Sequence, residues 1–403
     1  MEGERSLRKV SVLLSQAKQG RELILKSAPI SQPLRYILMG NSTVPQANPD
    51  SIAIRNLPIQ QRIDWLMEHA RRYAQLYQSP ESFLARERYS AKHDTAIIAL
   101  KCMDGRLNLS VATNTPAGII QPIRNLGGRF DMGWPHFGEV MTEQIQHMVR
   151  HGRRTLILIN YHYSKGDQHR GCAGWGYNTD AARDHALRTK RQVEEVFGSV
   201  HSTVYPLVCG FETDEDALVL HGSNHRDTLD LSTVSAQDLA SLPASLSRLY
   251  PDIPEEMQED LLPLIQGNIT HIEEVRKSDR TLEIVHHEWM IGIGRGFHWL
   301  HMPNLALIIG PYSPELADPL SKAGGIIAAN MRDERIPDDG FLLLSVAPYQ
   351  EVGVDRARAT LKSRFMAEFA AHIIRSDHAK IADKINIRKA VLSWHTRALE
   401  LIV

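Results

Sequence analysis

The hydrophobic positions of this chain fall into short apolar runs separated by longer amphipathic stretches. The runs Thr95–Leu100, Thr155–Tyr161 and Thr203–Gly210 each have the length and composition of a strand buried on both faces. Amphipathic stretches at Glu139–His151 and Thr179–Phe197 lie between them and favour helices. This alternation predicts an α/β fold in which helices connect parallel strands of a doubly wound sheet.

Helical patterns flank the alternating region on both sides. An N-terminal helical region is predicted over residues 1–90, with an amphipathic segment at Ser6–Lys26 and a clearer helix at Ile59–Tyr77. On the other side, residues 235–277 have the polar-helical pattern of a connecting helical pair. The segment between them, residues 91–234, is predicted to be the first α/β domain.

The last third of the chain repeats the pattern of the middle third. Asn304–Ile309 matches Thr95–Leu100, and Phe341–Tyr349 matches Thr155–Tyr163 position by position. We therefore expect residues 235–403 to hold the linker helices followed by a degenerate second copy of the α/β domain. Chance similarity between apolar strands is the competing explanation.

Length and charge limit the classes of function. The chain has 403 residues and is 43% hydrophobic, which is enough for a sizeable core in two or three domains. Its net charge of −1 gives no reason to expect nucleic acid as a partner. No apolar run approaches the ~20 residues that span a bilayer, and the N-terminus lacks a secretory signal. A soluble intracellular protein with no membrane association is expected.

The three cysteines point to a metal site rather than to a disulfide framework. Cys102 directly follows one buried strand, and His162 lies at the end of the next, so both are expected where neighbouring parallel strands open into one crevice. Catalytic Zn²⁺ takes three protein ligands and leaves a fourth position for water. We predict Cys102, His162 and Cys172 as these ligands. A plain His-x-x-Cys spacing would select His169 instead of His162.

The second copy is predicted to lack the metal. In the register of the repeat, Pro348 stands where His162 stands, and no cysteine follows Cys209.

Asp104 and Arg106 follow Cys102 at alternate positions. In an extended segment these three side chains would share one face. A carboxylate beside zinc can accept a hydrogen bond from the bound hydroxide and so orient the hydroxide lone pair toward substrate. The guanidinium would keep that carboxylate ionised and turned from the metal. A structural zinc site needs neither group, so the pair indicates catalysis. The competing interpretation is a surface ion pair, which contributes little to stability.

These residues resemble the β-class carbonic anhydrases, and more closely their divergent branch, the carboxysome shell carbonic anhydrases. The resemblance extends over roughly residues 94–380. The segments that carry it are Cys102–Arg106, Arg124–Arg129, Tyr161–Ser164, His169–Asp180, Gly210–Leu218 and His286–Glu288.

The resemblance implies a fold with an N-terminal helical domain, a zinc-binding catalytic domain and a decayed C-terminal copy. It implies reversible hydration of CO₂ to bicarbonate and a proton, with Asp104, Arg106 and His286 as catalytic residues. Without the resemblance, His286 would be interpreted as a surface histidine. The proton carrier could be His286, His169 or buffer.

The resemblance also implies a setting. It places the protein in a carboxysome, supplying CO₂ to Rubisco, as a homodimer or higher homo-oligomer with Rubisco or shell proteins as partners. One alternative is a cytoplasmic β-class carbonic anhydrase, or a hydrolase of COS or CS₂, outside a carboxysome. An alternative of another class is an inactive luminal scaffold that binds Rubisco.

Overall fold

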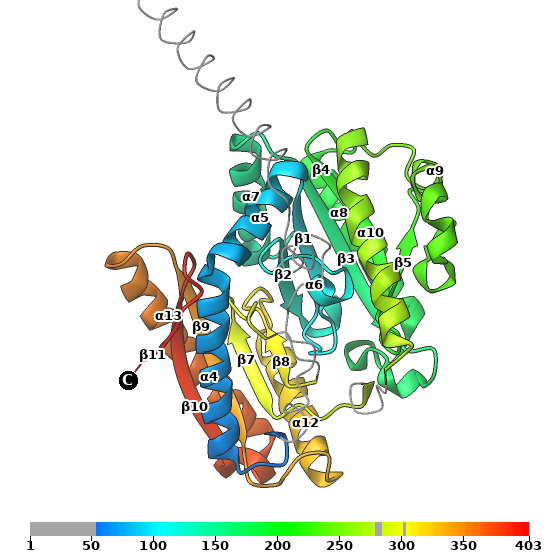
Figure 1. Ribbon diagram of the computed structural model, residues 1–403. Coiled ribbons are helices and arrows are strands. Elements are labelled where there is room, and N and C mark those ends of the chain that lie inside the picture. The colour runs from blue at the N-terminus through cyan, green and yellow to red at the C-terminus, as the bar shows by residue number, and fades with distance from the viewer. Residues whose placement is uncertain (1–53, 279–283, 301–303, 403) are drawn as a thin grey trace, which may run out of the picture. The chain divides into compact units, whose positions relative to one another are not determined.

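The computed structural model describes residues 54–278, 284–300 and 304–402, all of which lie in one compact unit, Ser42–Val403. The helix expected at Ser6–Lys26 lies outside the described residues. Two mixed sheets, each with helices packed on it, form this unit (Figure 1). None of the described helices is long and apolar enough to cross a bilayer. The α/β class predicted from the sequence is confirmed.

The first sheet has six strands in the order β2-β1-β3-β4-β5-β6. Strands β2, β1, β3 and β4 are parallel, whereas β5 and β6 are antiparallel to their neighbours. The strands are β1 (Ala96–Cys102), β2 (Ile120–Asn125), β3 (Thr155–Tyr163), β4 (Val204–Glu212), β5 (Ala217–His221) and β6 (Thr228–Asp230).

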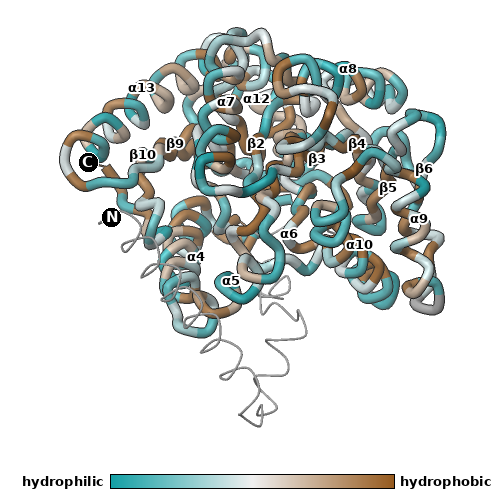
Figure 2. The backbone as a smooth tube through the Cα atoms, turned by 90° about the horizontal axis from the view of Figure 1, so that it is seen from above, coloured by the Kyte–Doolittle hydropathy of each residue, from teal (hydrophilic) through white to brown (hydrophobic). Residues whose placement is uncertain are grey.

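Alternate residues of these strands belong to separate hydrophobic clusters on the two faces of the sheet. Ile98 and Ile157 belong to the cluster formed with two helices, whereas Ile97 and Leu156 belong to the main core. Figure 2 shows hydrophobic positions along the strands and polar ones along the outer helices. The helices of the first cluster are α7 (Pro135–Arg150) and α8 (Thr179–Phe197). Those that pack on this sheet from the main core, which continues into the second sheet, are α6 (Leu109–Ala112), α9 (Leu242–Leu249) and α10 (Glu255–Val275).

The second sheet has five strands in the order β11-β10-β9-β7-β8, with only β11 antiparallel to its neighbour. Its strands are β7 (Met290–Gly294), β8 (Ala306–Ile309), β9 (Phe341–Tyr349), β10 (Ile385–Ser393) and β11 (Leu399–Leu401). The helices that pack with it are α12 (Ala317–Arg332), α13 (Val354–Asp377) and α4 (Ile59–Gln78), which precedes α5 (Pro80–Lys92).

The two sheets share one topology. Reading β8-β7-β9-β10-β11 against β2-β1-β3-β4-β5 matches parallel with parallel strands and places an antiparallel strand last in each. The register also agrees at two of the strand pairs. Ile97 pairs with Leu156 as Met290 pairs with Leu342, and Cys209 pairs with Leu220 as Ala390 pairs with Leu401. The agreement across the strands supports a duplication rather than chance similarity.

The alignment corrects one part of the predicted repeat. Phe341–Tyr349 does correspond to Thr155–Tyr163, because β9 and β3 occupy the same place in their sheets. Asn304–Ile309, however, contains β8, whose counterpart is β2, so its match to Thr95–Leu100 was wrong. The true counterpart of β1 is the glycine-rich β7, whose short Met-Ile-Gly-Ile-Gly sequence gives a weak strand signal.

The two sheets meet directly beside the end of β1. The backbone N–H of Ile308 donates to Met103 O at 2.9 Å, and that of Gly310 donates to Arg124 O at the same distance. Between them, Gly105 comes so close to β8 that a Cβ atom on it would lie 2.4 Å from Ala306 O. A side chain at position 105 would therefore separate the two halves at the point where the predicted ligands lie.

Candidate metal centre

The predicted ligands come together at the carboxyl edge of the first sheet. Cys102 is the last residue of β1, and His162 lies near the end of β3, which pairs with β1 in parallel. Cys172 lies in the loop after β3, directly before a 3₁₀ turn at Ala173–Trp175. Their ligand atoms lie within 4.8 Å of one another, and all three residues are buried.

The cluster fits a zinc ion. Two sulfurs at about 2.3 Å from a tetrahedral Zn²⁺ are separated by about 3.8 Å, and the Sγ atoms of Cys102 and Cys172 are 4.0 Å apart. Both ring nitrogens of His162 are buried without a hydrogen-bond partner. A buried polar atom left in this way destabilises the fold, whereas a metal ion would satisfy one of the two nitrogens.

His169 lies apart from this cluster. Its side chain is 83% exposed, and its Nδ1 lies 3.3 Å from Asp167 Oδ1. Although the His-x-x-Cys spacing brings His169 close to Cys172 in the sequence, the loop turns its ring toward solvent. The geometry therefore favours His162 as the third ligand.

The glycine-containing segment after β2 packs against the ligands. Gly128 has a φ of +63°, and a Cβ atom there would lie 2.9 Å from Asn160 O and 3.5 Å from Cys102 N. The indole of Trp175, in the turn after Cys172, donates to Gly127 O at 2.8 Å. These contacts fix the loop that carries the second thiol against the strand that carries the first.

Asp104 and Arg106 form a buried pair beside the cluster. Asp104 Oδ2 lies 2.6 Å from Arg106 Nη2 and 3.9 Å from His162 Nε2. Burial alone would raise the pKa of the Asp104 carboxyl, but Arg106 and then His286 outweigh it and hold that pKa well below its usual value. The carboxylate therefore stays ionised at neutral pH.

The pair does not form in the predicted way. The chain turns after Met103 instead of continuing extended, and the backbone N–H of Arg106 donates to Asp104 Oδ1 at 2.9 Å. The guanidinium Nε donates to the same oxygen at 3.0 Å. A tight turn thus brings the two side chains together, and it uses Gly105 at its centre.

Two buried basic side chains, Lys101 and Arg124, lie beside the thiols. Lys101 Nζ donates to Leu107 O at 2.6 Å, and Arg124 Nη1 donates to Asp104 O at 3.2 Å. Burial lowers the pKa of Lys101 well below its usual value and that of Arg124 to about 10. The contact with Cys172, and then His162, lower the pKa of Cys102, whereas the contact with Cys102 and burial raise that of Cys172. Ionisation of one thiol therefore opposes ionisation of the other unless a positive charge lies between them.

The second copy supplies His286 to this site. Its Nε2 lies 3.1 Å from Arg106 Nη2, and its Nδ1 lies 2.8 Å from Glu288 Oε1. The sequence indicated His286 only through the family resemblance and gave no role to Glu288. The signal available for Glu288 was its place two residues before β7 in a His-x-Glu pattern.

The matching positions in the second copy carry no comparable donors. By the register of the sheets, Arg295 takes the place of Cys102 and Pro348 that of His162, and both line a cavity of about 620 Å³. In the described part of the chain, the two clusters with metal-ligand geometry both lie at the first site: Cys102, His162 and Cys172, and Asp104, His286 and Glu288.

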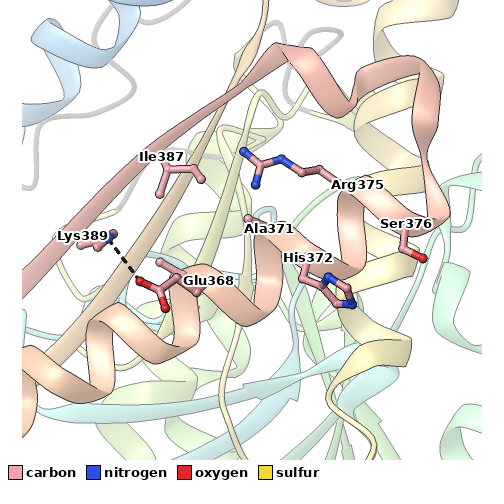
Figure 3. Close-up of a pocket in the computed structure, with 8 residues that line it drawn as sticks. Glu368, Ala371, His372, Arg375, Ser376, Ile387 and Lys389 are labelled. Atoms are coloured by element: carbon pink, nitrogen blue, oxygen red, sulfur yellow. Dashed lines mark ion pairs between the residues drawn. The ribbon is translucent and has the colours of Figure 1, made fainter.

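A further pocket of about 510 Å³ lies between α13 and β10 (Figure 3). Its rim carries the ion pair Lys389–Glu368, with a 3.6 Å separation, and the side chains of His372 and Arg375. No cluster with metal-ligand geometry is found there among the described residues. Among the described residues, the side chains suited to hold a metal therefore lie at the first site.

The segment that carries these ligands also matches known proteins. Residues 93–249 match the family model described as the carboxysome shell carbonic anhydrase, catalytic domain. This part of the chain is therefore similar to the catalytic domain of the carboxysome shell carbonic anhydrases. The matched segment contains Cys102, His162 and Cys172, and the resemblance predicted from the motifs is confirmed.

Individual carboxysome shell carbonic anhydrases are also similar to the chain in sequence. The carboxysome shell carbonic anhydrase of Prochlorococcus marinus subsp. pastoris is 27% identical over 240 residues, 51% of this chain and 46% of the relative. That of Hydrogenovibrio crunogenus is 27% identical over 51% of this chain and 45% of its own length. The chain thus matches less than half the length of these relatives. A solved β-carbonic anhydrase aligns with 42% of this chain and 99% of its own, at 13% identity and a TM-score of 0.32.

Proposed function

We propose that the chain is a zinc-dependent carbonic anhydrase that interconverts CO₂ and bicarbonate. The observation that carries this proposal is the buried Cys102–His162–Cys172 cluster, with its unpartnered imidazole, next to the ionised Asp104–Arg106 pair. A structural zinc site would need no such pair. When bound, zinc would supply the Lewis acidity that makes water a nucleophile near neutral pH, an effect for which carbonic anhydrases are the established example.

The chain's own groups then have separate tasks. Asp104 Oδ2, which faces His162, would accept a hydrogen bond from the reacting water and orient it. Arg106 binds both carboxylate oxygens, which keeps Asp104 from turning to the metal. Arg124, whose pKa of about 10 keeps it charged at neutral pH, adds positive charge beside thiolates and a carboxylate that are negative, whereas the buried Lys101 donates to Leu107 O.

We also propose the carboxysome as the site of action. The support is similarity to relatives named as carboxysome shell enzymes. In that setting the reaction would deliver CO₂ to Rubisco, with Rubisco or shell proteins and further copies of the chain as partners.

Metal analysis and stopped-flow kinetics on the purified chain test the proposal. We expect one zinc per chain and CO₂ hydration at a kcat/KM of at least about 10⁶ M⁻¹s⁻¹, within the range of efficient enzymes. Assaying COS hydrolysis beside CO₂ hydration separates the sister activity, because a COS hydrolase would be faster on COS. A chain that binds no zinc and hydrates no CO₂ would be the inactive scaffold.

The pH dependence should reflect the two sulfur ligands. Two thiolates cancel the formal charge of Zn²⁺, so the reacting water should be less acidic than on three imidazoles, although Arg124 offsets part of this effect. We expect kcat/KM to rise between about pH 6.5 and 9. Steady-state rates in buffers of constant ionic strength measure this, and a flat profile would contradict it.

A further inference from the structure

A short segment of the second copy reaches into the candidate metal centre. His286 and Glu288 lie directly before β7, whose first residue is Met290. The Glu288 carboxylate is fully buried, whereas the His286 side chain is 17% exposed. Asn330 of α12 donates to Glu288 O at 3.0 Å and to Glu288 Oε2 at 3.3 Å. Both the strand and the helix of the second copy therefore fix the position of this carboxylate.

The contacts of His286 define its tautomer. A guanidinium can only donate hydrogen bonds, so at the 3.1 Å contact with Arg106 Nη2 the His286 Nε2 atom must accept. The ring proton is then on Nδ1, which donates to Glu288 Oε1 at 2.8 Å. A contact on each nitrogen thus selects one neutral tautomer and one ring orientation.

We propose that Glu288 is a positioning residue, which holds His286 with its Nε2 lone pair toward the Arg106–Asp104 pair so that Nε2 can accept the proton released in hydration. This inference rests on the proposed function. The proton comes from the water that adds to CO₂, and it leaves Nε2 for a buffer base, which restores the neutral ring. The oxygen of that water leaves the site in bicarbonate.

The charge around the ring supports this arrangement. Burial lowers the pKa of His286, but the Glu288 carboxylate outweighs burial and leaves that pKa above its usual value. Protonation of Nε2 ends its hydrogen bond from Arg106 and places a positive ring beside the guanidinium, so Arg106 lowers the pKa of His286 while Glu288 raises it. Asp104, on the other side of Arg106, is the second negative group that faces the ring.

The competing explanation is that Glu288 merely neutralises buried charge. The two explanations predict different outcomes when the carboxylate becomes an amide. If Glu288 positions His286, removing its carboxylate lowers kcat only while His286 is present. An external proton acceptor should then restore kcat whether Glu288 or His286 is changed. If Glu288 only stabilises the fold, its loss lowers stability and zinc content whether or not His286 is present.

The test compares Glu288→Gln, His286→Ala and the double variant in the full chain. We expect kcat to fall about 10- to 100-fold in each single variant, the double variant to be no slower than His286→Ala, and added imidazole to restore kcat in all three. Zinc content should not change. His287→Ala is the matched control, because its Nδ1 contacts Val285 O instead of the site. Additive losses without rescue by imidazole, or loss of zinc, would overturn the proposal.

A second measurement does not depend on catalysis. Nitrogen-15 NMR of labelled histidine, with His286→Ala to assign the signal, should show His286 protonated at Nδ1 in the wild type and a mixture of tautomers in Glu288→Gln. An unchanged tautomer would refute the positioning role, even if the wild type did not hydrate CO₂. If Glu288→Gln fails to fold, Asn330→Ala serves instead, and it should shift the same signal by freeing the carboxylate.

Discussion

Substitution of Cys102 by alanine is expected to remove the bound zinc and to lower CO₂ hydration at least about a thousandfold, since metal-assisted activation of water is lost. The remaining ligands, His162 and Cys172, leave too few donors for a closed coordination shell. The fold itself should persist, because Cys102 ends its strand and the strand's other residues remain buried. Zinc per chain from metal analysis and stopped-flow rates measure the two losses.

Cys209→Ala is the matched control. Cys209 is also fully buried, and burial raises its pKa to about 12, so it is an unreactive thiol within β4. Its truncation should destabilise the protein by about 1 kcal/mol through the small cavity it leaves, with zinc and activity retained. Equal loss of zinc from both variants would show that general destabilisation, and not ligand removal, explains the first result.

Arg106→Met is expected to lower both stability and CO₂ hydration strongly, but to leave the zinc bound. It leaves Asp104 as a buried carboxylate without its partner, which destabilises a protein by about 3–5 kcal/mol. The freed carboxylate can turn toward the metal, so hydration should fall at least about a hundredfold while zinc stays bound. Urea unfolding, metal analysis and stopped-flow rates separate these effects.

The double variant Asp104→Asn with Arg106→Met makes this prediction specific. Removing both charges should restore most of the lost stability, because no isolated charge remains buried. Activity should not recover, since the group that orients water is absent. Recovery of activity along with stability would mean that the pair serves the fold and not the reaction.

The sequence predicts the buried parallel strands well because their apolar runs are long. Thr155–Tyr161 and Phe341–Tyr349 stand out, and the structure contains strands at both. The sequence predicts no strand for β2, β5, β6, β7, β10 or β11, most of which are short, glycine-rich or only partly buried and so have too little apolar pattern. Such strands are stabilised by their neighbours in the sheet, which a single-sequence pattern does not contain.

The residues of the candidate site likewise fall into those that the sequence predicts and those that it does not. Cys102 and His162 follow from position at strand ends, because parallel strands open on one edge. The choice between His162 and His169 as the third ligand needed the loop geometry, which places the His169 ring in solvent. Glu288 could not be derived at all, since its role depends on contacts between segments about 180 positions apart, such as Arg106 with His286. The boundaries predicted for the domains stay predictions.

The metal site could not be rebuilt in the second copy by point substitutions alone. Proline stands at position 348 inside β9, and arginine at 295 after β7. Moreover, residues 350–353 connect β9 directly to α13, whereas residues 164–178 of the first copy form the long loop that carries Cys172. Point substitutions could restore two donors there but not a third. The stoichiometry of such a chain is thus limited by its architecture: however many copies assemble, each would contribute a single catalytic ion.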